Sequence, residues 1–303
     1  MSATTDQIRV IVLANKSKAQ VPEELDQLLP WLSQRAKVVA VPDITMTADE
    51  DLQWPQADLA VVLGGDGTML AQARRILDLT IPLLGVNFGK LGFLAEFSID
   101  DLHRHWDQIA TGSCSKTSRL MVDVMVFDAD AADCHLNRFD MDHLKARSSA
   151  MNDAVITAGS PFRMIELALA IDPTREGEPG TVFAGDGVIL STPSGSTAHN
   201  MAAGGPIVSP DQDALCITPI CPQSLAFRPI VTNADSVITV RVMSANPGST
   251  LVIDGQASVS LETGDQVVVR RHARRLTVVQ NPDLNYWQML ARKMRWAARP
   301  RRR

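Results

Sequence analysis

The sequence of 303 residues lacks long apolar runs, an excess of positive charge and any regular spacing of cysteines. Because no run of about eighteen apolar residues occurs, we expect no membrane span. The net charge of −5 argues against a general nucleic-acid binder, so no nucleic acid is expected as a partner. The four cysteines match no zinc or redox pattern, and the first residues lack the basic start and cleavage site of a signal peptide. These absences predict a cytoplasmic protein with reduced thiols.

Several catalytic signatures are also missing. The sequence contains neither the G-x-x-x-x-G-K-[ST] loop of P-loop enzymes nor the G-x-S-x-G turn of serine hydrolases. Leu70 stands where a dinucleotide-binding fingerprint needs its third glycine. The histidines form no metal-binding pattern, so we expect no metal held by a dedicated protein site.

Apolar residues make up 45% of the chain, which is enough for a sizeable core. Within residues 1–112, short apolar runs alternate with segments of helical spacing. This alternation predicts a Rossmann-like α/β domain with a mostly parallel sheet covered on both faces. One predicted helix spans 22–36, and Pro30 is expected to kink it. Ligands of such sheets bind at the carboxyl ends of the strands.

The pattern changes after about residue 112. Residues 113–274 contain short β-rich segments separated by turn residues, which predicts an all-β second domain. Its polar stretch 128–147 is expected to form an extended hairpin tip or loop. Residues 275–303 are able to pack back on the first domain, and 283–297 have the amphipathic pattern of a helix. With two domains, we expect the active site in the cleft between them.

The sharpest motif is a glycine turn at residues 64–68, which follows an apolar strand and precedes a helical segment; it consists of Gly64, Gly65, Asp66, Gly67 and Thr68. Glycines let a phosphate approach backbone N–H groups, and the following helix presents its positive N-terminal end. Asp66 does not suit a simple phosphate cradle, because a carboxylate about 4 Å from a phosphate charge costs roughly 1 kcal/mol even in water. A kinase, in contrast, can use it to accept a hydroxyl proton or to help hold magnesium.

A second motif spans residues 185–210 and begins with a Gly-Asp-Gly triplet centred on Asp186. Its pattern predicts a strand, a turn and a short helix that starts near Thr197. The hydroxyls of Ser196 and Thr197 are placed to cap that helix or to reach a ligand. Small residues from Ala198 onward leave space for a flat group. The residues alone leave open whether this is a ligand pocket or a tightly packed helix.

The glycine turn resembles the superfamily that includes NAD kinases, 6-phosphofructokinases and lipid kinases of the diacylglycerol and sphingosine type. Residues 185–210 resemble the NAD kinase pattern, which the other members do not share. The glycine-rich segment 85–94, with its Leu-Gly-Phe-Leu, and the Asp-Gly-Gln at 254–256 resemble it as well. From about residue 58 to its end, the chain is therefore identified as a member of the NAD kinase family. The sequence departs from the family pattern at Ala71, His199 and Asn200, where a basic residue, Tyr and Ser are usual.

The resemblance implies ATP-dependent phosphorylation of NAD at the 2′-hydroxyl of its adenosine ribose, which gives NADP. It also implies Mg²⁺ or another divalent cation bound with ATP, and a homodimer or homotetramer. Asp66 would be the general base and Gly67 would contact a nucleotide phosphate, while Gly64, Gly65 and Thr68 would belong to the nucleotide-binding residues. Asn152 and Asp153 would hold adenosine, because a carboxylate accepts two vicinal hydroxyls and an amide both donates to and accepts from a base edge.

Further binding residues follow from their positions in these motifs. Asp186 would lie near the nicotinamide end, and Gln256 would reach the dinucleotide. Arg163 is a candidate pyrophosphate partner, because a guanidinium fork matches phosphate oxygens; a surface arginine is the equal alternative. Thr197 and Ala198 would line the adenine pocket, and the remaining predicted nucleotide-binding residues are His199, Asn200, Met201 and Ala202.

Two rival functions remain open at this stage. A related kinase of the glycine-turn superfamily would act on a lipid or sugar-phosphate hydroxyl, and a non-catalytic sensor would bind NAD(P) without turnover. The intact Asp66 favours an enzyme over a sensor. The last twelve residues hold seven basic groups, which is typical of a solvated tail, with attachment to anionic lipid or nucleic acid as the alternative.

Overall fold

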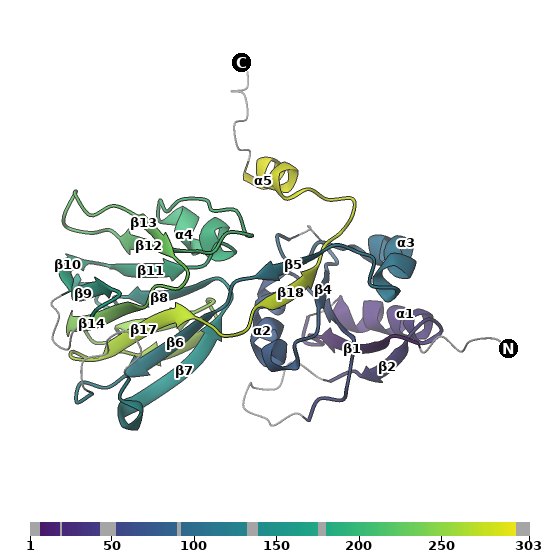
Figure 1. Ribbon diagram of the computed structural model, residues 1–303, viewed down its shortest axis with the longest axis horizontal. Helices are drawn as coiled ribbons and strands as arrows, with labels where there is room; N and C mark the ends of the chain where they lie inside the picture. The colour runs from purple at the N-terminus through teal and green to yellow at the C-terminus, as the bar shows by residue number, and fades with distance from the viewer. Residues whose placement is uncertain are drawn as a thin grey trace, which may run out of the picture. The chain divides into compact units, whose positions relative to one another are not determined.

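Figure 1 shows the computed structural model of the chain, which describes residues 7–18, 20–42, 53–89, 92–131, 139–174 and 180–294. The chain forms two compact units. The first is made of Met1–Ser118 and Leu276–Arg303, and the second of Arg119–Arg275. The chain therefore leaves the first unit, builds the second and returns. Residues 295–303, which hold most of the basic tail, lie outside the described residues.

The first unit is built on a six-stranded sheet with the strand order β2-β1-β3-β4-β18-β5. The pairs β1–β2, β1–β3, β3–β4 and β4–β18 run parallel, which confirms the mostly parallel sheet predicted from the apolar runs. β18 comes from the far end of the chain and lies between β4 and β5. The strands are β1 (Arg9–Ala14), β2 (Lys37–Ala40), β3 (Leu59–Leu63), β4 (Leu83–Val86), β5 (Lys116–Arg119) and β18 (Leu276–Val279).

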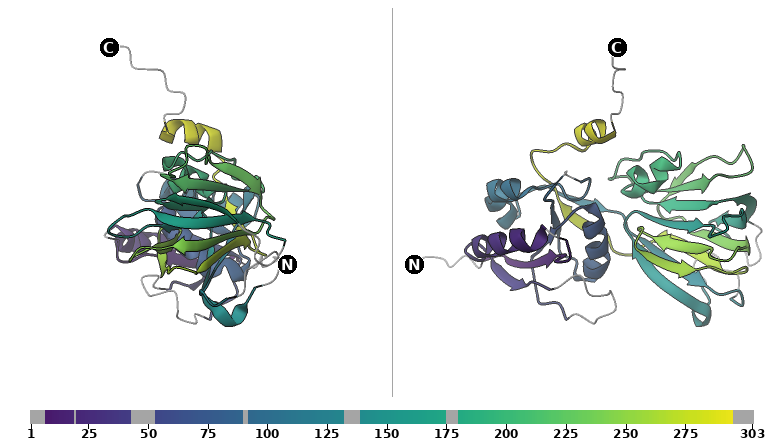
Figure 2. Two further views of the ribbon diagram at one scale, coloured as in Figure 1. Left: turned by 90° about the vertical axis from the view of Figure 1, so that its left-hand side faces the viewer. Right: turned by 180° about the vertical axis from the view of Figure 1, so that it is seen from behind.

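Helices cover both faces of this sheet. The apolar residues of α1 and α3 pack in one cluster with alternate residues of β1, β3 and β4. The right-hand view of Figure 2 shows α2 on the opposite face. Such covering is expected for parallel strands that are buried along their whole length. The helices are α1 (Val21–Ser33), α2 (Asp66–Ile76), the 3-10 turn η1 (Leu77–Leu79), α3 (Ile99–Ala110) and α5 (Tyr286–Met294).

Two predicted helices end or begin elsewhere than the sequence pattern indicated. α1 contains Pro30 within it and ends at Ser33, three residues before the predicted end. α5 begins at Tyr286, three residues after the predicted start, because the side chain of Asn285 caps it. Oδ1 of Asn285 accepts a hydrogen bond from the backbone N–H of Trp287 at 2.9 Å.

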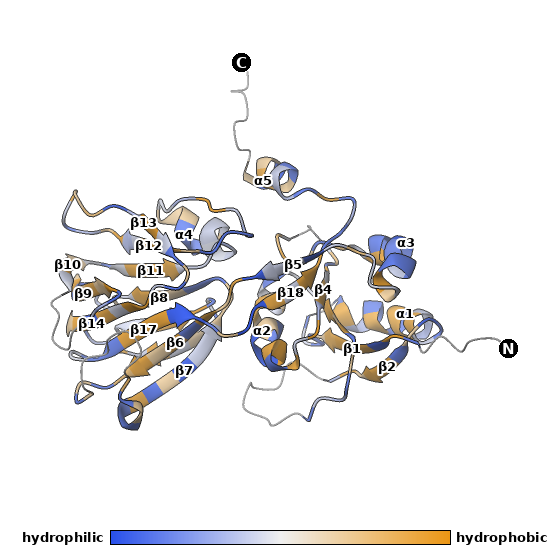
Figure 3. Ribbon diagram, in the orientation of Figure 1, coloured by the Kyte–Doolittle hydropathy of each residue, from blue (hydrophilic) through white to orange (hydrophobic). Residues whose placement is uncertain are grey.

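The second unit is a β-sandwich of two six-stranded antiparallel sheets, which confirms the predicted all-β architecture. The strand orders are β10-β9-β14-β17-β6-β7 and β13-β12-β11-β8-β15-β16. Alternate residues of both sheets form one shared apolar core, to which Val124 and Ile156 belong. In Figure 3 hydrophobic residues are concentrated along the strands of both units, whereas α3 carries many hydrophilic residues.

The elements of the second unit are β6 (Val122–Phe127), η2 (Met141–His143), β7 (Leu144–Ala150), β8 (Asp153–Thr157), β9 (Ile165–Ile171), β10 (Thr181–Gly185), β11 (Gly187–Ser191), η3 (Gly195–Thr197), α4 (His199–Ala202), β12 (Ala214–Ile220), β13 (Ile230–Asn233), β14 (Ile238–Ser244), β15 (Thr250–Ile253), β16 (Ala257–Ser260) and β17 (Gln266–Arg271). No helix in the described part of the chain is long and apolar enough to cross a membrane.

The expectation of a hairpin tip or loop over 128–147 is wrong at its C-terminal end. β7 starts at Leu144 and pairs antiparallel with β6. Because β7 is an edge strand of its sheet, much of it contacts water, and its polar sequence LKARSSA carries little of the apolar signal of a strand. Residues 132–138 of the same stretch lie outside the described residues.

Candidate active site

The glycine turn connects β3 to α2 in the first unit. β3 ends at Leu63, and α2 begins at Asp66 with Gly65 as its N-cap. Gly64 has a φ of +151°, and a Cβ there would lie 2.5 Å from Oγ1 of Thr68, so only glycine fits this position. The turn places the positive N-terminal end of α2 at the carboxyl end of β3. This is where open α/β sheets bind ligands, and a helix N-terminus suits an anion.

Asp66 is half-buried, and its carboxylate is held by three backbone N–H groups. Oδ2 lies 2.8 Å from the backbone nitrogen of Phe93, and Oδ1 lies 3.0 Å from those of Leu94 and Ala95. We call these three N–H groups the amide clasp. A Cβ on Gly92 would lie 1.7 Å from Oδ1 of Asp66, so the clasp depends on glycine there. The carboxylate of Asp66 is therefore fixed in one orientation at the start of α2.

The amide clasp and one lysine are the parts of this site that sequence reasoning missed. Segment 85–94 was notable only for its glycines and its Leu-Gly-Phe-Leu, and nothing in it indicated a contact with Asp66. Nζ of Lys18 donates to Oγ1 of Thr68 at 2.9 Å, which brings a positive charge to the first turn of α2. Lys18 lies before residue 58, where the sequence offered only the β-α pattern, so no signal pointed to it.

The second unit contains a pocket of about 270 Å³ between the start of β8, the end of β15 and the start of α4. Four of the predicted site residues line it: Asn152, Asp153, Ala198 and His199. The other lining residues are Val155, Thr157, Val252, Asp254 and Gly255. The structure thus brings the second and third sequence motifs and the Asp-Gly-Gln segment to one place. A pocket of this size with apolar walls and a few polar groups suits part of a nucleotide.

Asp254 organises this pocket. It is buried, and its carboxylate accepts N–H bonds from Met151 at 3.1 Å, Asn152 at 2.7 Å and Asp153 at 3.2 Å. The hydroxyl of Thr192 donates to the carbonyl of Met151 at 2.5 Å from the other side. The chain just before β8 is therefore held from two sides, which fixes where the following side chains point.

Two buried polar groups of the pocket are unusual: one has no hydrogen-bond partner among the described residues, and the other has a raised pKa. Oδ1 of Asn152 is buried and has no hydrogen-bond partner among the described residues, although buried acceptors are nearly always paired. Asp153 is 4% exposed. Burial, and then the charge of Asp254, raises the pKa of Asp153 to about 7. The pocket therefore offers a free acceptor and a carboxyl that can donate or accept near neutral pH.

The motif at 185–210 is largely held by its own hydrogen bonds. Oγ of Ser196 donates to the carbonyl of Pro193 at 2.7 Å and accepts the N–H of Val208 at 3.1 Å. Asn200 is fully buried; its Nδ2 donates to the carbonyl of Pro206 at 2.9 Å, and its Oδ1 accepts from Thr218 at 2.6 Å. These side chains shape the turn from inside the protein.

The predicted helix of this motif is shorter than expected. Instead of one helix from near Thr197, the chain forms η3 and then the single turn α4. In this described stretch neither element begins with a side-chain cap, so the expected capping by Ser196 or Thr197 is not found. Ser196 is fully buried, and Thr197 is half-buried beside the pocket residue Ala198.

The remaining predicted residues are spread around the second unit. Met201 is half-buried and Ala202 exposed on α4, and Gln256 is exposed next to the pocket residue Gly255. Asp186 lies at the opposite end of the β8–β11 pair from Asp153; its carbonyl accepts the N–H of Ala158 at 2.8 Å, whereas Ser191 is the β11 partner of Asp153. Arg163 is exposed in the connection from β8 to β9, outside the pocket lining.

Comparisons with known proteins identify the family of the chain. Residues 10–114 match the ATP-NAD kinase N-terminal domain, and residues 151–281 match the ATP-NAD kinase C-terminal domain. The NAD kinase of Geotalea daltonii is 36% identical over 281 residues, which cover 90% of this chain and 93% of that protein. The NAD kinase of Geobacter sulfurreducens is 39% identical over 243 residues, which cover 80% of each chain.

Two solved structures share the fold. Yeast NADH kinase complexed with NADH has a TM-score of 0.79 at 24% identity, over 98% of this chain and 90% of that chain. An NAD kinase from Archaeoglobus fulgidus in complex with ATP has a TM-score of 0.67 at 22% identity, over 95% and 99%. With both domains matched and relatives above 30% identity over most of its length, the chain belongs to the ATP-NAD kinase family.

Proposed function

We propose that this chain transfers the γ-phosphoryl group of ATP to the 2′-hydroxyl of the adenosine ribose of NAD, giving NADP and ADP. Its membership of the ATP-NAD kinase family supports this reaction. The observation that carries the assignment is the fixed carboxylate of Asp66 at the start of α2, directly after a glycine turn suited to phosphates. A hydroxyl group that attacks a phosphoryl group must lose its proton to a base, and Asp66 supplies the carboxylate of this turn for that role.

The glycine turn serves the donor in this proposal. Gly64, Gly65 and Gly67 let the phosphates approach the backbone, and the N-terminal end of α2 offsets their charge. Lys18, held on Thr68, adds a positive charge at the same place. Such fixed charges stabilise the transferring phosphoryl group without reorganisation during the reaction.

Asp66 acts as the general base. As the 2′-oxygen attacks the γ-phosphorus, its proton passes to the carboxylate of Asp66, and the bond between phosphorus and the β,γ-bridging oxygen breaks to release ADP. The amide clasp keeps the carboxylate in one orientation, so the side chain does not have to reorient before each turnover. A positioned base of this kind contributes about 10²–10⁴-fold to the rate.

The pocket of the second unit receives the adenosine of NAD. The unpaired Oδ1 of Asn152 accepts an N–H from the adenine edge, and the carboxyl of Asp153 binds the ribose hydroxyls. Ala198 and His199 form the wall against the base. We propose the roles of the outlying residues from their motif positions: Asp186 toward the nicotinamide end, Gln256 and Thr197 beside the nucleotide, and Arg163 toward the pyrophosphate.

Mg²⁺ or another divalent cation accompanies ATP in this proposal. The glycine turn offers one carboxylate, whose oxygens already accept the N–H groups of the clasp, and the described residues contain no group of three or more His, Cys, Asp or Glu side chains suited to a metal. This donor set fits an ion that is held mainly by the phosphates. The ion would neutralise charge that develops on the leaving phosphate oxygens.

We further propose that the chain is cytoplasmic and forms a homodimer or homotetramer. Size measurements in solution would test the oligomeric state.

The test is an assay of the purified chain with NAD, ATP and Mg²⁺, in which NADP is detected with an NADP-specific dehydrogenase and Asp66→Asn is the control. NADP formed by the wild type and nearly abolished in the variant supports both the reaction and the base. NAD binding without NADP formation would favour a sensor. Neither binding nor turnover would favour a kinase of the same superfamily that acts on a lipid or sugar-phosphate hydroxyl.

A further inference from the structure

The loop that carries the amide clasp belongs to no helix or strand in the described chain over residues 92–96. A turn bond from the N–H of Gly92 to the carbonyl of Ala95 at 2.9 Å and the pairing of Phe97 with Val86 shape it in part. At Phe93 and Glu96 the loop also contacts residues 281–294, a segment from the far end of the sequence that lies in the same unit. This segment is not part of the glycine turn, and no motif in the sequence connected it with Asp66.

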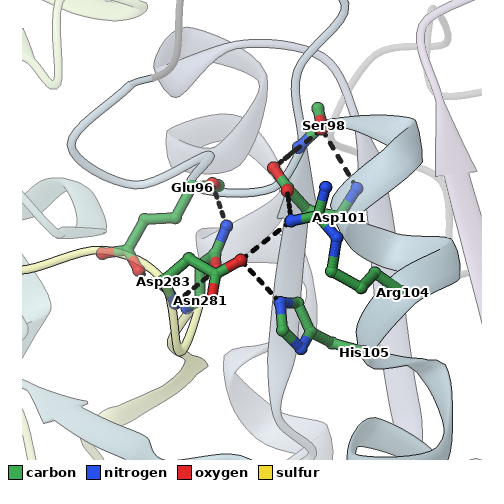
Figure 4. Close-up of polar contacts among 7 residues, drawn as sticks. All are labelled: Glu96, Ser98, Asp101, Arg104, His105, Asn281 and Asp283. Carbon is green, nitrogen blue, oxygen red and sulfur yellow. Dashed lines mark hydrogen bonds and ion pairs between the residues drawn. The ribbon is translucent and has the colours of Figure 1, made fainter.

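Asn281 holds the loop at Glu96, the residue that follows the clasp (Figure 4). The backbone N–H of Asn281 donates to Oε2 of Glu96 at 3.0 Å, and Nδ2 of Asn281 donates to the carbonyl oxygen of Glu96, also at 3.0 Å. Both residues are buried, Glu96 at 5% and Asn281 at 2% exposure. Hydrogen bonds shielded from water at both the side chain and the backbone fix the position of this peptide, because a buried polar group that loses its partner is strongly disfavoured.

α5 holds the other end of the loop at Phe93, whose N–H donates to Asp66. The ammonium of Lys293 lies 4.8 Å from the centroid of the Phe93 ring, and the ring of Tyr286 lies 6.1 Å from it. These are ordinary distances for cation–π and aromatic contacts. Residues at both ends of the clasp therefore contact one continuous segment, residues 281–294.

The segment is itself anchored on α3 (Figure 4). Oδ1 of Asn281 accepts the backbone N–H of Asp283 at 2.9 Å. Oδ2 of Asp283 lies 2.8 Å from Nη1 of Arg104 and 2.9 Å from Nε2 of His105. α3 in turn begins with a capping box between Ser98 and Asp101, just after the loop. The side chains of Asp283 and Arg104 are exposed, and the contacts of Asp283 with α3 touch neither Glu96 nor the clasp, so they can be weakened separately from the Asn281 contacts.

We propose that Asn281 is a positioning residue for phosphoryl transfer, acting through Glu96 and the amide clasp on the carboxylate of Asp66. The proposal rests on the role of Asp66 given above. A displacement of about 1 Å in a group that orients the reacting atoms can lower a rate about 10²-fold. Loss of the Asn281 contacts should therefore reduce turnover, while the pocket of the second unit keeps its affinity for NAD.

The experiment compares the full-length wild type with Asn281→Asp, which keeps the size and removes the donor to the Glu96 carbonyl, and Asn281→Ser, which is too short to reach it and adds no charge. Asp283→Asn is the matched control, because it weakens the contacts to α3 and leaves the Glu96 contacts intact. We expect kcat to fall about 10- to 100-fold in both Asn281 variants, with the dissociation constant of NAD within about twofold of the wild type. Asp283→Asn should keep kcat within about twofold.

A double-mutant cycle separates positioning from a general loss of structure. If Asn281 acts through Asp66, Asn281→Ser should lower kcat much less in an Asp66→Asn background than in the wild type. Hydrogen exchange at residues 93–95 should also quicken in the Asn281 variants and not in Asp283→Asn. Losses of kcat that multiply fully in the cycle, or unchanged kcat in both Asn281 variants, overturn the proposal while the wild-type activity stands. A wild type that makes no NADP overturns the proposed function itself, and the positioning role falls with it.

Discussion

Each unit of this protein contains an aspartate whose carboxylate is held by three successive backbone N–H groups. Asp66 is held by residues 93–95, and Asp254 by residues 151–153. The surroundings differ: Asp66 is half-buried at the start of α2, whereas Asp254 is buried directly after β15. In the first unit, the three hydrogen bonds fix the carboxylate of Asp66 itself. In the second unit, they fix Asn152 and Asp153, which line the pocket. Changes at Asp66 should affect turnover, and changes at Asp254 should affect binding.

The largest effect is expected for Asp66→Asn. An amide cannot take up the proton of the attacking hydroxyl, so kcat should fall by about 10²–10⁴-fold. NAD binding should be nearly unchanged, because the proposed adenosine pocket lies in the other unit. Steady-state kinetics and a direct NAD titration measure both quantities. Near-normal turnover would remove the assignment of Asp66 as the base.

Gly92→Ala tests the clasp without touching the acid. The new methyl group would meet Oδ1 of Asp66 at 1.7 Å and must displace it, so we expect kcat to fall about 10²-fold. Gly89→Ala is the matched control in the same segment, since a Cβ there meets no atom of the described residues within 4 Å. Equal activities of the two variants would show that the orientation of Asp66 has no effect on the reaction.

Asp254→Asn should produce the opposite pattern. The amide replaces one acceptor oxygen by a donor, leaves at least one buried N–H of residues 151–153 unpaired, and lowers the free energy of unfolding by about 1–3 kcal/mol. The dissociation constant of NAD should rise about tenfold with kcat within about threefold, because binding residues move and the base does not. Asp235→Asn, at a side chain 73% exposed, is the surface control. A loss confined to kcat would contradict the division of roles between the two aspartates.

The smallest effect concerns stability and pH. The pKa of Asp153 is raised to about 7 in the folded protein, whereas the unfolded chain titrates near about 3.9. Between these values the folded state holds a proton that the unfolded state has released, so stability falls as pH rises toward 7. Relative to Asp153→Asn, the wild type should lose about 2 kcal/mol of unfolding free energy between about pH 5 and pH 8. Urea denaturation of both proteins at several pH values measures the free energy of unfolding. Parallel pH profiles would show that the pKa of Asp153 is not raised in the folded protein.

The fold was predictable where burial leaves a clear pattern. β3 is buried along its whole length, and such continuous apolar runs between helical segments indicate a parallel sheet. β7 was missed because an edge strand needs no apolar face. The sequence allowed residues 275–303 to pack back on the first domain, but it did not place β18 between β4 and β5, since the short apolar run of β18 resembles the strands of the sandwich.

The candidate site was predictable as a set of motifs but not as a set of contacts. The glycine turn and segment 85–94 were both recognisable, yet the bonds from Asp66 to residues 93–95 span 27 to 29 positions and follow no periodicity. Asp254 was noted as part of Asp-Gly-Gln, but its contact with Asn152 lies 102 positions away. Lys18 and Asn281 carry no local signature, because their roles depend only on what the fold places beside them.

The return of the chain to its first unit sets an order on its synthesis. β18 lies between β4 and β5, so the first sheet cannot be completed until the whole second unit has been synthesised. The contacts of Asn281 and Lys293 with the clasp loop form later still. A nascent chain therefore carries Asp66 and the clasp residues long before Asn281 and Lys293 can contact the clasp loop, and termination before β18 leaves the first sheet incomplete.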